Sequence, residues 1–148
     1  MMVRPSGLRW VAEDAADLHI VSAAVQDAVL KPKDIHYIPS RYRLDLELNR
    51  FRWELDGIDI RIRSVLSFNT VMSVMSRGIS KRNSDDVLSL LAIEFEPDPD
   101  PPGGCIHLIF SDKGELRIKV EALEMTLLDS EYQWSTPRRP RHEKRVPK

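Results

Sequence analysis

Apolar and polar residues alternate along much of this chain, which is the pattern of a β-strand with one buried face. The alternation is clearest over residues 43–48, 58–63 and 116–120, where aliphatic and charged residues take turns. One dry and one charged face favour antiparallel sheets, because parallel sheets are usually covered on both sides. We therefore expect an α+β fold dominated by an antiparallel β-sandwich or partly open barrel of about seven to eight strands.

One segment near the N-terminus follows the helical period instead. Asp14 can accept hydrogen bonds from the free N–H groups of a first turn, and Asp17 stands at the capping-box position three residues later. We expect one amphipathic helix over residues 14–26, preceded by a short strand over residues 8–13 and packed on the sheet. Its apolar stripe consists of Leu18, Ile20, Val21, Ala24, Val25 and Ala28.

Two predicted hairpins resemble each other. The first covers residues 35–48 and the second residues 106–120, each with turn-forming residues between its strands. In both, the apolar phase then shifts by one residue, as at a β-bulge that bends a strand. Either the fold contains a pseudo-duplicated unit, over residues 34–55 and 105–127, or two amphipathic hairpins are alike by chance.

Two local questions stay open in the sequence. Residues 121–132 have a composition that suits a helix, but their apolar positions alternate, so we favour a strand. In residues 48–54, Arg50 and Arg52 are interleaved with Phe51 and Trp53. With a bulge, the aromatic rings are core and the arginines are solvated, which is the favoured reading; without one, the rings are exposed and can stack on a ligand.

Cations mark candidate binding residues. Residues 77–83 place three cations around Gly78, whose dihedral freedom suits an anion-binding loop, and the alternative is a solvated connection. Arg61 and Arg63 would strengthen an anion site if their strand lies beside this loop. The candidate binding residues are Arg50, Trp53, Arg61, Arg63, Arg77, Lys81 and Arg82, for an unknown protein or a small anionic ligand.

Charge is divided unevenly along the chain. Residues 136–148 hold six Lys/Arg and one Glu, for a net charge of +5, whereas the rest holds 16 basic and 22 acidic residues. We expect a single globular domain over residues 1–135 and a disordered basic tail over residues 136–148. The tail either contacts nucleic acid or is a solubilising end. Its candidate nucleic-acid residues are Arg138, Arg139, Arg141, Lys144 and Arg145.

The sequence contains none of the common nucleophile, phosphate-loop or metal motifs, so we expect no cofactor, no metal site and no catalytic residue. Prolines separate the acids of residues 94–100, which splays their carboxylates. Cys105 is the one cysteine, and there is neither a signal peptide nor a membrane-spanning run, so we expect a cytoplasmic protein without membrane contact. The four histidines, which share no motif, are His19, His36, His107 and His142.

Four segments together resemble a family of short alphaproteobacterial proteins known as a domain of unknown function. They are residues 26–28, 48–51, 77–79 and 90–95, and the likeness extends over about residues 8–134. Because that family has no established activity, the resemblance implies a bacterial cytoplasmic origin and little else. We expect a non-catalytic ligand- or protein-binding module; the alternatives are a nucleic-acid-associated accessory protein that uses the tail and residues 77–83, and an enzyme with an unrecognised site.

Overall fold

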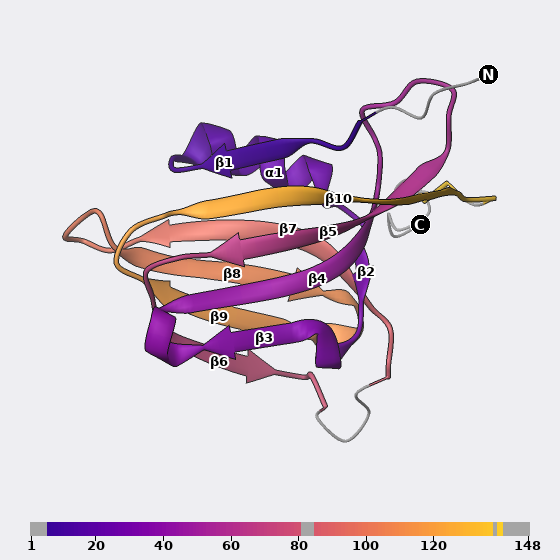
Figure 1. Ribbon diagram of the computed structural model, residues 1–148. Coiled ribbons are helices and arrows are strands. Elements are labelled where there is room, and N and C mark those ends of the chain that lie inside the picture. Colours follow the sequence, from indigo (N-terminus) through magenta and orange to yellow (C-terminus); the bar gives the residue numbers. More distant parts are fainter. Residues whose placement is uncertain (1–5, 81–84, 138, 141–148) are drawn as a thin grey trace, which may run out of the picture.

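A computed structural model describes residues 6–80, 85–137 and 139–140 (Figure 1). In these ranges the chain forms ten strands, one α-helix and three short 3-10 helices. The strands are β1 (Arg9–Ala12), β2 (Val29–Leu30), β3 (Ile35–Ile38), β4 (Arg43–Phe51), β5 (Ile60–Phe68), β6 (Val71–Arg77), β7 (Leu88–Pro97), β8 (Gly104–Phe110), β9 (Glu115–Val120) and β10 (Met125–Ser135). The helices are α1 (Ala15–Ala24), η1 (Pro32–Asp34), η2 (Pro39–Arg41) and η3 (Ser111–Lys113).

The strands form one antiparallel sheet that folds back on itself into two layers. Its hydrogen-bonded order is β1-β10-β5-β4-β2-β7-β8-β9-β6, with β3 added beside β4. The short strand β2 joins the layers, because Val29 pairs with Asn49 of β4 and with Ser89 of β7. The expected antiparallel α+β class is confirmed, and the sheet is open between β1 and β6. The described residues form ten strands and not the expected seven to eight. The sequence pattern does not reveal β2, which has two residues, or β6, which lacks strict alternation.

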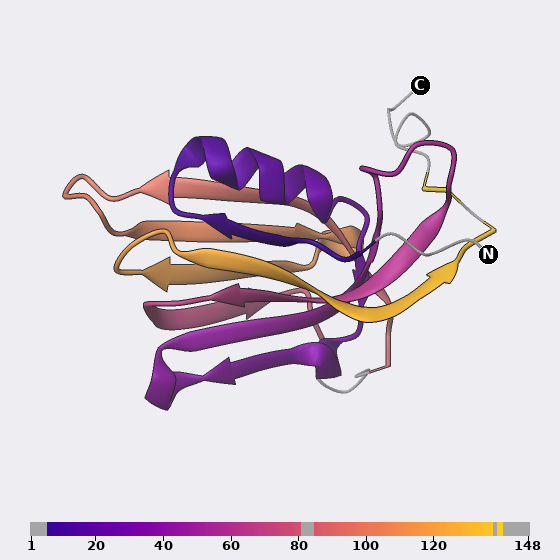
Figure 2. The same cartoon turned by 45° about the horizontal axis from the view of Figure 1, so that its top comes forward.

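The core lies between the two layers and follows the alternation in the sequence. Every second residue of β4 from Leu44 to Arg50, and of β8 from Gly104 to Phe110, is buried. The helix α1 covers the side of the sandwich between β1 and β7, to which it contributes Leu18 and Val21 (Figure 2). Ile20 is 55% exposed, so its predicted place in the apolar stripe is wrong.

The predicted cap of α1 is confirmed, because Oδ1 of Asp14 accepts a hydrogen bond of 2.8 Å from the backbone N–H of Asp17. Replacing an N-cap aspartate leaves that N–H without its partner. We expect Asp14→Ala to lower the free energy of unfolding by about 1 kcal/mol in urea titrations. Glu13→Ala, one residue earlier and exposed, serves as the control and should change it by less than about 0.5 kcal/mol. Equal effects of the two variants would contradict a capping role.

The two predicted hairpins are present but are not copies of one unit. β3 pairs with β4 and β8 with β9, and Ile35 opposite Leu46 corresponds to Ile106 opposite Ile118 with the expected offset. Their surroundings differ, since β4 pairs with the next strand, β5, whereas β9 pairs with the earlier β6. β10 crosses to β5 in the other layer, so the topology contradicts the duplication, and it confirms a strand at residues 125–132.

Candidate functional site

The apolar phase shift at the end of β4 buries cations as well as an aromatic ring. Phe51 is fully buried, as favoured from the sequence, but Arg50 and Arg52 are buried too, so their predicted solvation is wrong. The backbone N–H of Arg52 donates to the carbonyl of Ile60, which keeps this end of β4 on the neighbouring strand. Burying two guanidinium groups requires partners that neutralise them and accept their hydrogen bonds.

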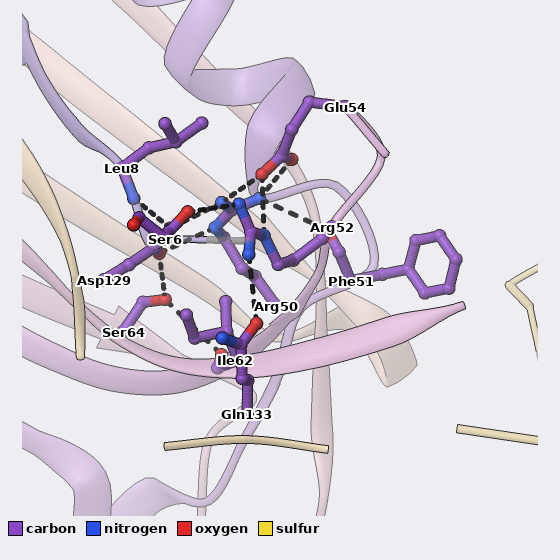
Figure 3. A network of polar contacts seen from close by, with 10 residues as sticks. All are labelled: Ser6, Leu8, Arg50, Phe51, Arg52, Glu54, Ile62, Ser64, Asp129 and Gln133. Carbon is purple, nitrogen blue, oxygen red and sulfur yellow. Dashed lines mark hydrogen bonds and ion pairs between the residues drawn. The ribbon is translucent and has the colours of Figure 1, made fainter. Parts of the chain in front are cut away.

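Arg50 is held by two carboxylates, one along each of two N–H edges of its guanidinium group (Figure 3). Its Nε and Nη2 lie 2.8 and 2.6 Å from the carboxylate oxygens of Asp129, and its Nη1 and Nη2 lie 2.9 Å from those of Glu54. The guanidinium carbon also lies 5.1 Å from the ring centroid of Trp10. Two bidentate pairs use four of its five N–H donors, Nη1 also donates to the carbonyl of Phe51 at 3.4 Å, and the cation–π contact covers the guanidinium face.

Asp129 joins three parts of the chain. Its fully buried carboxylate accepts hydrogen bonds from Arg50, from Ser64 Oγ at 2.6 Å and from the backbone N–H of Leu8 at 2.9 Å. Burial favours the neutral acid, but these donors outweigh it and hold the pKa of Asp129 below its ordinary value. The residue stays ionised and fastens the N-terminal segment to β5 and β10.

Glu54 bridges the two buried arginines. Its Oε2 accepts from Nε of Arg52 at 2.9 Å as well as from Arg50. Burial opposes ionisation, yet the arginines lower the pKa of Glu54 to about 2. Arg52 also donates to Gln133 Oε1 at 3.0 Å and to the carbonyl of Ser6 at 2.7 Å.

We call Arg50, Arg52, Glu54 and Asp129 the buried ion cluster. Its two positive and two negative charges cancel, and each group is engaged by another member. A cluster neutralised in this way stabilises a tertiary arrangement and presents no spare acid or base to a ligand. The contacts make Arg50, a candidate binding residue from the sequence, part of the scaffold.

Trp53 is also engaged by the chain itself. Its Nε1 donates to the carbonyl of Gln26 at 3.0 Å, and its ring centroid lies 4.6 Å from that of Phe51. The guanidinium carbon of Arg139 lies 5.3 and 5.5 Å from the centroids of these two rings, and its Nη1 lies 3.3 Å from Oδ1 of Asp59. A residue of the basic tail thus occupies the place where the sequence suggested a stacked ligand.

The remaining candidate cations that lie within the described residues do not form one site. Arg61 donates to the carbonyl of Asn49 at 3.0 Å, and burial lowers its pKa. Arg63 lies 3.4 Å from Asp34 and 3.3 Å from Glu47. Arg77 is the last residue of β6, in the other layer. The candidates Lys81, Arg82, Arg138, Arg141, Lys144 and Arg145 lie outside the described residues.

The start of the tail contacts the body of the domain. The backbone N–H of Thr136 donates to the carbonyl of Asp59 at 2.9 Å, and Arg139 contacts the aromatic pair described above. The division into a domain over residues 1–135 and a disordered tail over residues 136–148 stays a prediction. Residues 141–148 lie outside the described part of the chain.

A groove of about 1030 Å³ crosses the outer face of one layer, and sequence reasoning missed it. A row of outward side chains runs across it from Arg9 through Leu128 and Val65 to Glu47, set by the strand register. Leu128 is 51% exposed, which is unusual for a leucine in the middle of a strand. The residues lining the groove are Arg9, Ile35, His36, Tyr37, Ile38, Arg43, Asp45, Glu47, Val65, Ser67, Asn69, Thr126 and Leu128.

Most charges around this groove are paired. Arg43 Nε lies 2.8 Å from Asp45 Oδ1, and His36 Nε2 lies 3.6 Å from Glu47 Oε2. Within the described ranges, Arg9 has no carboxylate in ion-pair distance. An apolar strip with one unpaired cation beside it is suited to a group that is apolar and anionic.

A second, smaller groove of about 620 Å³ lies on the outer face of β7, β8 and β9. His107 lies in it, with Nε2 3.5 Å from Glu96 and Nδ1 3.5 Å from Glu115. Since His36 lines the other groove, the two strand histidines do not meet. No group of three or more metal-binding side chains is found over the residues that the structure describes.

Comparisons with known proteins identify a family and no activity. Neither the curated proteins nor the solved structures contain a match to this chain. In the described part, no helix is both long and apolar enough to cross a membrane. One family model, described as a protein of unknown function (DUF2948), matches residues 8–142. The match covers the domain almost from end to end, and the chain therefore belongs to the DUF2948 family.

Proposed function

We propose that this protein is a non-catalytic binding module whose ligand lies in the groove over β3, β4, β5, β10 and β1. The observation that carries the proposal is the exposed Leu128, which stands next to Val65 at the centre of the groove. Keeping a strand leucine half-exposed costs solvation free energy, and a ligand that covers it recovers that free energy.

The shape of the groove favours an extended segment of a partner protein. It is open along its length and crosses five neighbouring strands, unlike the enclosed pocket that surrounds most of a small molecule. Tyr37, 38% exposed, lies toward the β3 side, and Val11, 46% exposed, lies in the edge strand β1 on the other side. Aromatic and aliphatic side chains of this kind are frequent anchors in protein interfaces.

The positive charge of Arg9 sets a second requirement for the partner, an anionic group in the bound segment. Arg9 projects at one side of the groove without a carboxylate partner among the described side chains, whereas Arg43 is engaged by Asp45. A guanidinium group binds carboxylate oxygens in a bidentate geometry. We infer that the bound segment presents an aliphatic or aromatic side chain to Leu128 and a carboxylate to Arg9.

The two carboxylates of the buried ion cluster, Glu54 and Asp129, have lowered pKa values and support a binding role for this protein over a catalytic one. Glu54 and Asp129 are engaged by the arginines of the ion cluster, and neither of them lines a groove. A general acid or base needs access to substrate, so this cluster does not favour the enzyme alternative. The nucleic-acid alternative depends mainly on cations outside the described residues, and no observed contact favours it. A bacterial, alphaproteobacterial and cytoplasmic setting is part of our proposal.

Selection from a displayed random peptide library provides a test that needs no known partner. We expect the wild-type domain to select peptides that share an apolar residue and an acidic residue. Leu128→Glu places a carboxylate at the centre of the groove, and Arg9→Glu removes the cation. Each change should weaken binding of a selected peptide at least about tenfold in fluorescence polarisation, the effect of roughly 1.4 kcal/mol.

The matched control is Ile20→Glu, which changes a similarly exposed aliphatic residue on α1 that does not line the groove. It should bind the selected peptides as the wild type does. Circular dichroism of each variant establishes that it is folded. Peptides that bind wild type and Leu128→Glu with equal affinity would refute the groove as the binding site.

A further inference from the structure

β6 is an open edge of the sheet with little protection against pairing. It is the last strand of the hydrogen-bonded order and pairs with β9 on one side (Figure 1). Its residues from Val71 to Ser76 carry no charge, and Met75 is 66% and Met72 45% exposed. Natural edge strands usually carry charges or prolines that prevent another strand from adding.

The backbone of β6 is regular enough to receive a further strand. A register shift interrupts the ladder between Val71 and Ser73, and the pairs from Ser73 to Arg77 then follow without interruption. Within the described strands, the other edge of β6 has no ladder partner. The backbone N–H of Val71 donates to the carbonyl of Tyr42, so the outward N–H and C=O groups from Ser73 to Arg77 offer the template for an extended segment.

The two ends of β6 differ in charge. At its beginning, the backbone of Glu121 donates to Thr70 and that of Asn69 donates to Glu124, which places both glutamates at this end. At its other end, Arg77 is exposed, and Gly78 packs on the backbone of Lys113. In the described part of the chain, Arg77, Lys113 and the two glutamates have no opposite charge in ion-pair distance. Glu115, which faces Arg77 across the ladder, is paired with Arg117 at 3.2 Å.

We propose that β6 pairs with β6 of a second copy of this chain, antiparallel about a two-fold axis, so that the sheet continues from one copy into the other. Antiparallel pairing places the basic end of each strand beside the acidic end of the other, and the symmetry makes this contact twice. A parallel arrangement would set like charges side by side. The exposed methionines, which adapt well to contact surfaces, become buried between the copies.

This surface is separate from the groove, since none of the residues that line the groove belongs to β6. The pairing is confined to one short strand and its flanking side chains. We therefore expect a weak dimer whose population increases with protein concentration.

Sedimentation velocity of the full chain over a concentration series tests the pairing. Wild type should shift from monomer to dimer as the concentration increases, whereas Met75→Lys, which puts a charge on the edge, should stay monomeric. Val87→Lys changes a similarly exposed residue that lies outside β6 and should dimerise as wild type does. A wild type that stays monomeric up to the highest soluble concentration would overturn the proposal, as would a dimer unaffected by Met75→Lys.

A charge exchange tests the antiparallel geometry and does not depend on Met75. Arg77→Glu should weaken the dimer about tenfold, because two favourable contacts become two repulsive ones. Combining it with Glu121→Arg restores opposite charges and should restore the dimer. Failure of the double variant to recover would overturn the antiparallel arrangement. Leu128→Glu should leave dimerisation unchanged, so the experiments test peptide binding in the groove and dimerisation through β6 independently.

Discussion

Asp129→Ala is expected to lower the free energy of unfolding by about 3–5 kcal/mol, the largest effect of any single substitution that we predict. The variant removes two hydrogen bonds from Arg50 and leaves its guanidinium buried beside one carboxylate instead of two. It also removes the acceptor for Ser64 Oγ and for the backbone of Leu8. Urea unfolding, followed by tryptophan fluorescence, measures the change.

Asp85→Ala is the matched control for this prediction. Asp85 also forms an ion pair, with Lys33 Nζ at 2.9 Å, but its side chain is 74% exposed. Solvent and salt screen such a pair, so the variant should lose far less stability than Asp129→Ala. If Asp129→Ala is as mild as Asp85→Ala, the carboxylate does not hold Arg50 in solution as it does in the structure.

A second comparison separates the ion pair from the packing around it. In the double variant Arg50→Met/Asp129→Leu, both charges are replaced by apolar side chains of comparable length. Buried pairs replaced in this way often lose little stability, because no unpaired charge is left behind. The loss in the double variant should therefore be smaller than the sum of the losses in Arg50→Met and Asp129→Leu.

The buried ion cluster and the groove are built on the same strand. Asp129 of β10 points inward opposite Ser64, whereas its neighbour Leu128 points outward opposite Val65. Adjacent residues of a strand face opposite sides, so fixing one side chain also fixes the direction of the next. The cluster thus sets the register of β10 on β5, on which the floor of the groove depends.

Local pattern was sufficient for much of the fold. The leucines of β4 and the alternating residues of β8 and β9 are buried on one face, because period-two alternation follows directly from strand geometry. The cap at Asp14 was equally local, since its acceptor and donor are three residues apart. Features decided within one turn or one hairpin need no knowledge of the rest of the chain.

The candidate site depended on contacts that local pattern does not contain. Arg50 is buried because Asp129, 79 residues later, lies against it, and no feature near Arg50 indicates that partner. Arg139 covers Phe51 and Trp53 for a similar reason. The groove combines outward residues of five strands, and only their register brings Arg9 beside Leu128. An alternation predicts which face is outward, but not which strands are neighbours.

Lowering the pH from 5 to 2 is expected to reduce stability strongly, because the unfolded chain then binds protons at carboxylates that the folded ion cluster keeps ionised. The pKa of Glu54 is about 2 in the folded chain against an ordinary 4.5, and that of Asp129 is also lowered. A carboxylate with a depressed folded-state pKa stabilises fully above its unfolded pKa. That stabilisation is lost as the pH falls toward the folded value. The urea midpoint should therefore decrease over this interval.

Glu54→Gln separates the contribution of this carboxylate from that of the other acids. The variant should be less stable than wild type at pH 7, since its amide cannot neutralise Arg50 and Arg52. It should also lose less stability between pH 5 and pH 2, because one of the protons taken up on unfolding is gone. The two stability curves should converge at low pH. Parallel curves would show that the protonation of Glu54 is not linked to folding, even though the arginines hold it from both sides.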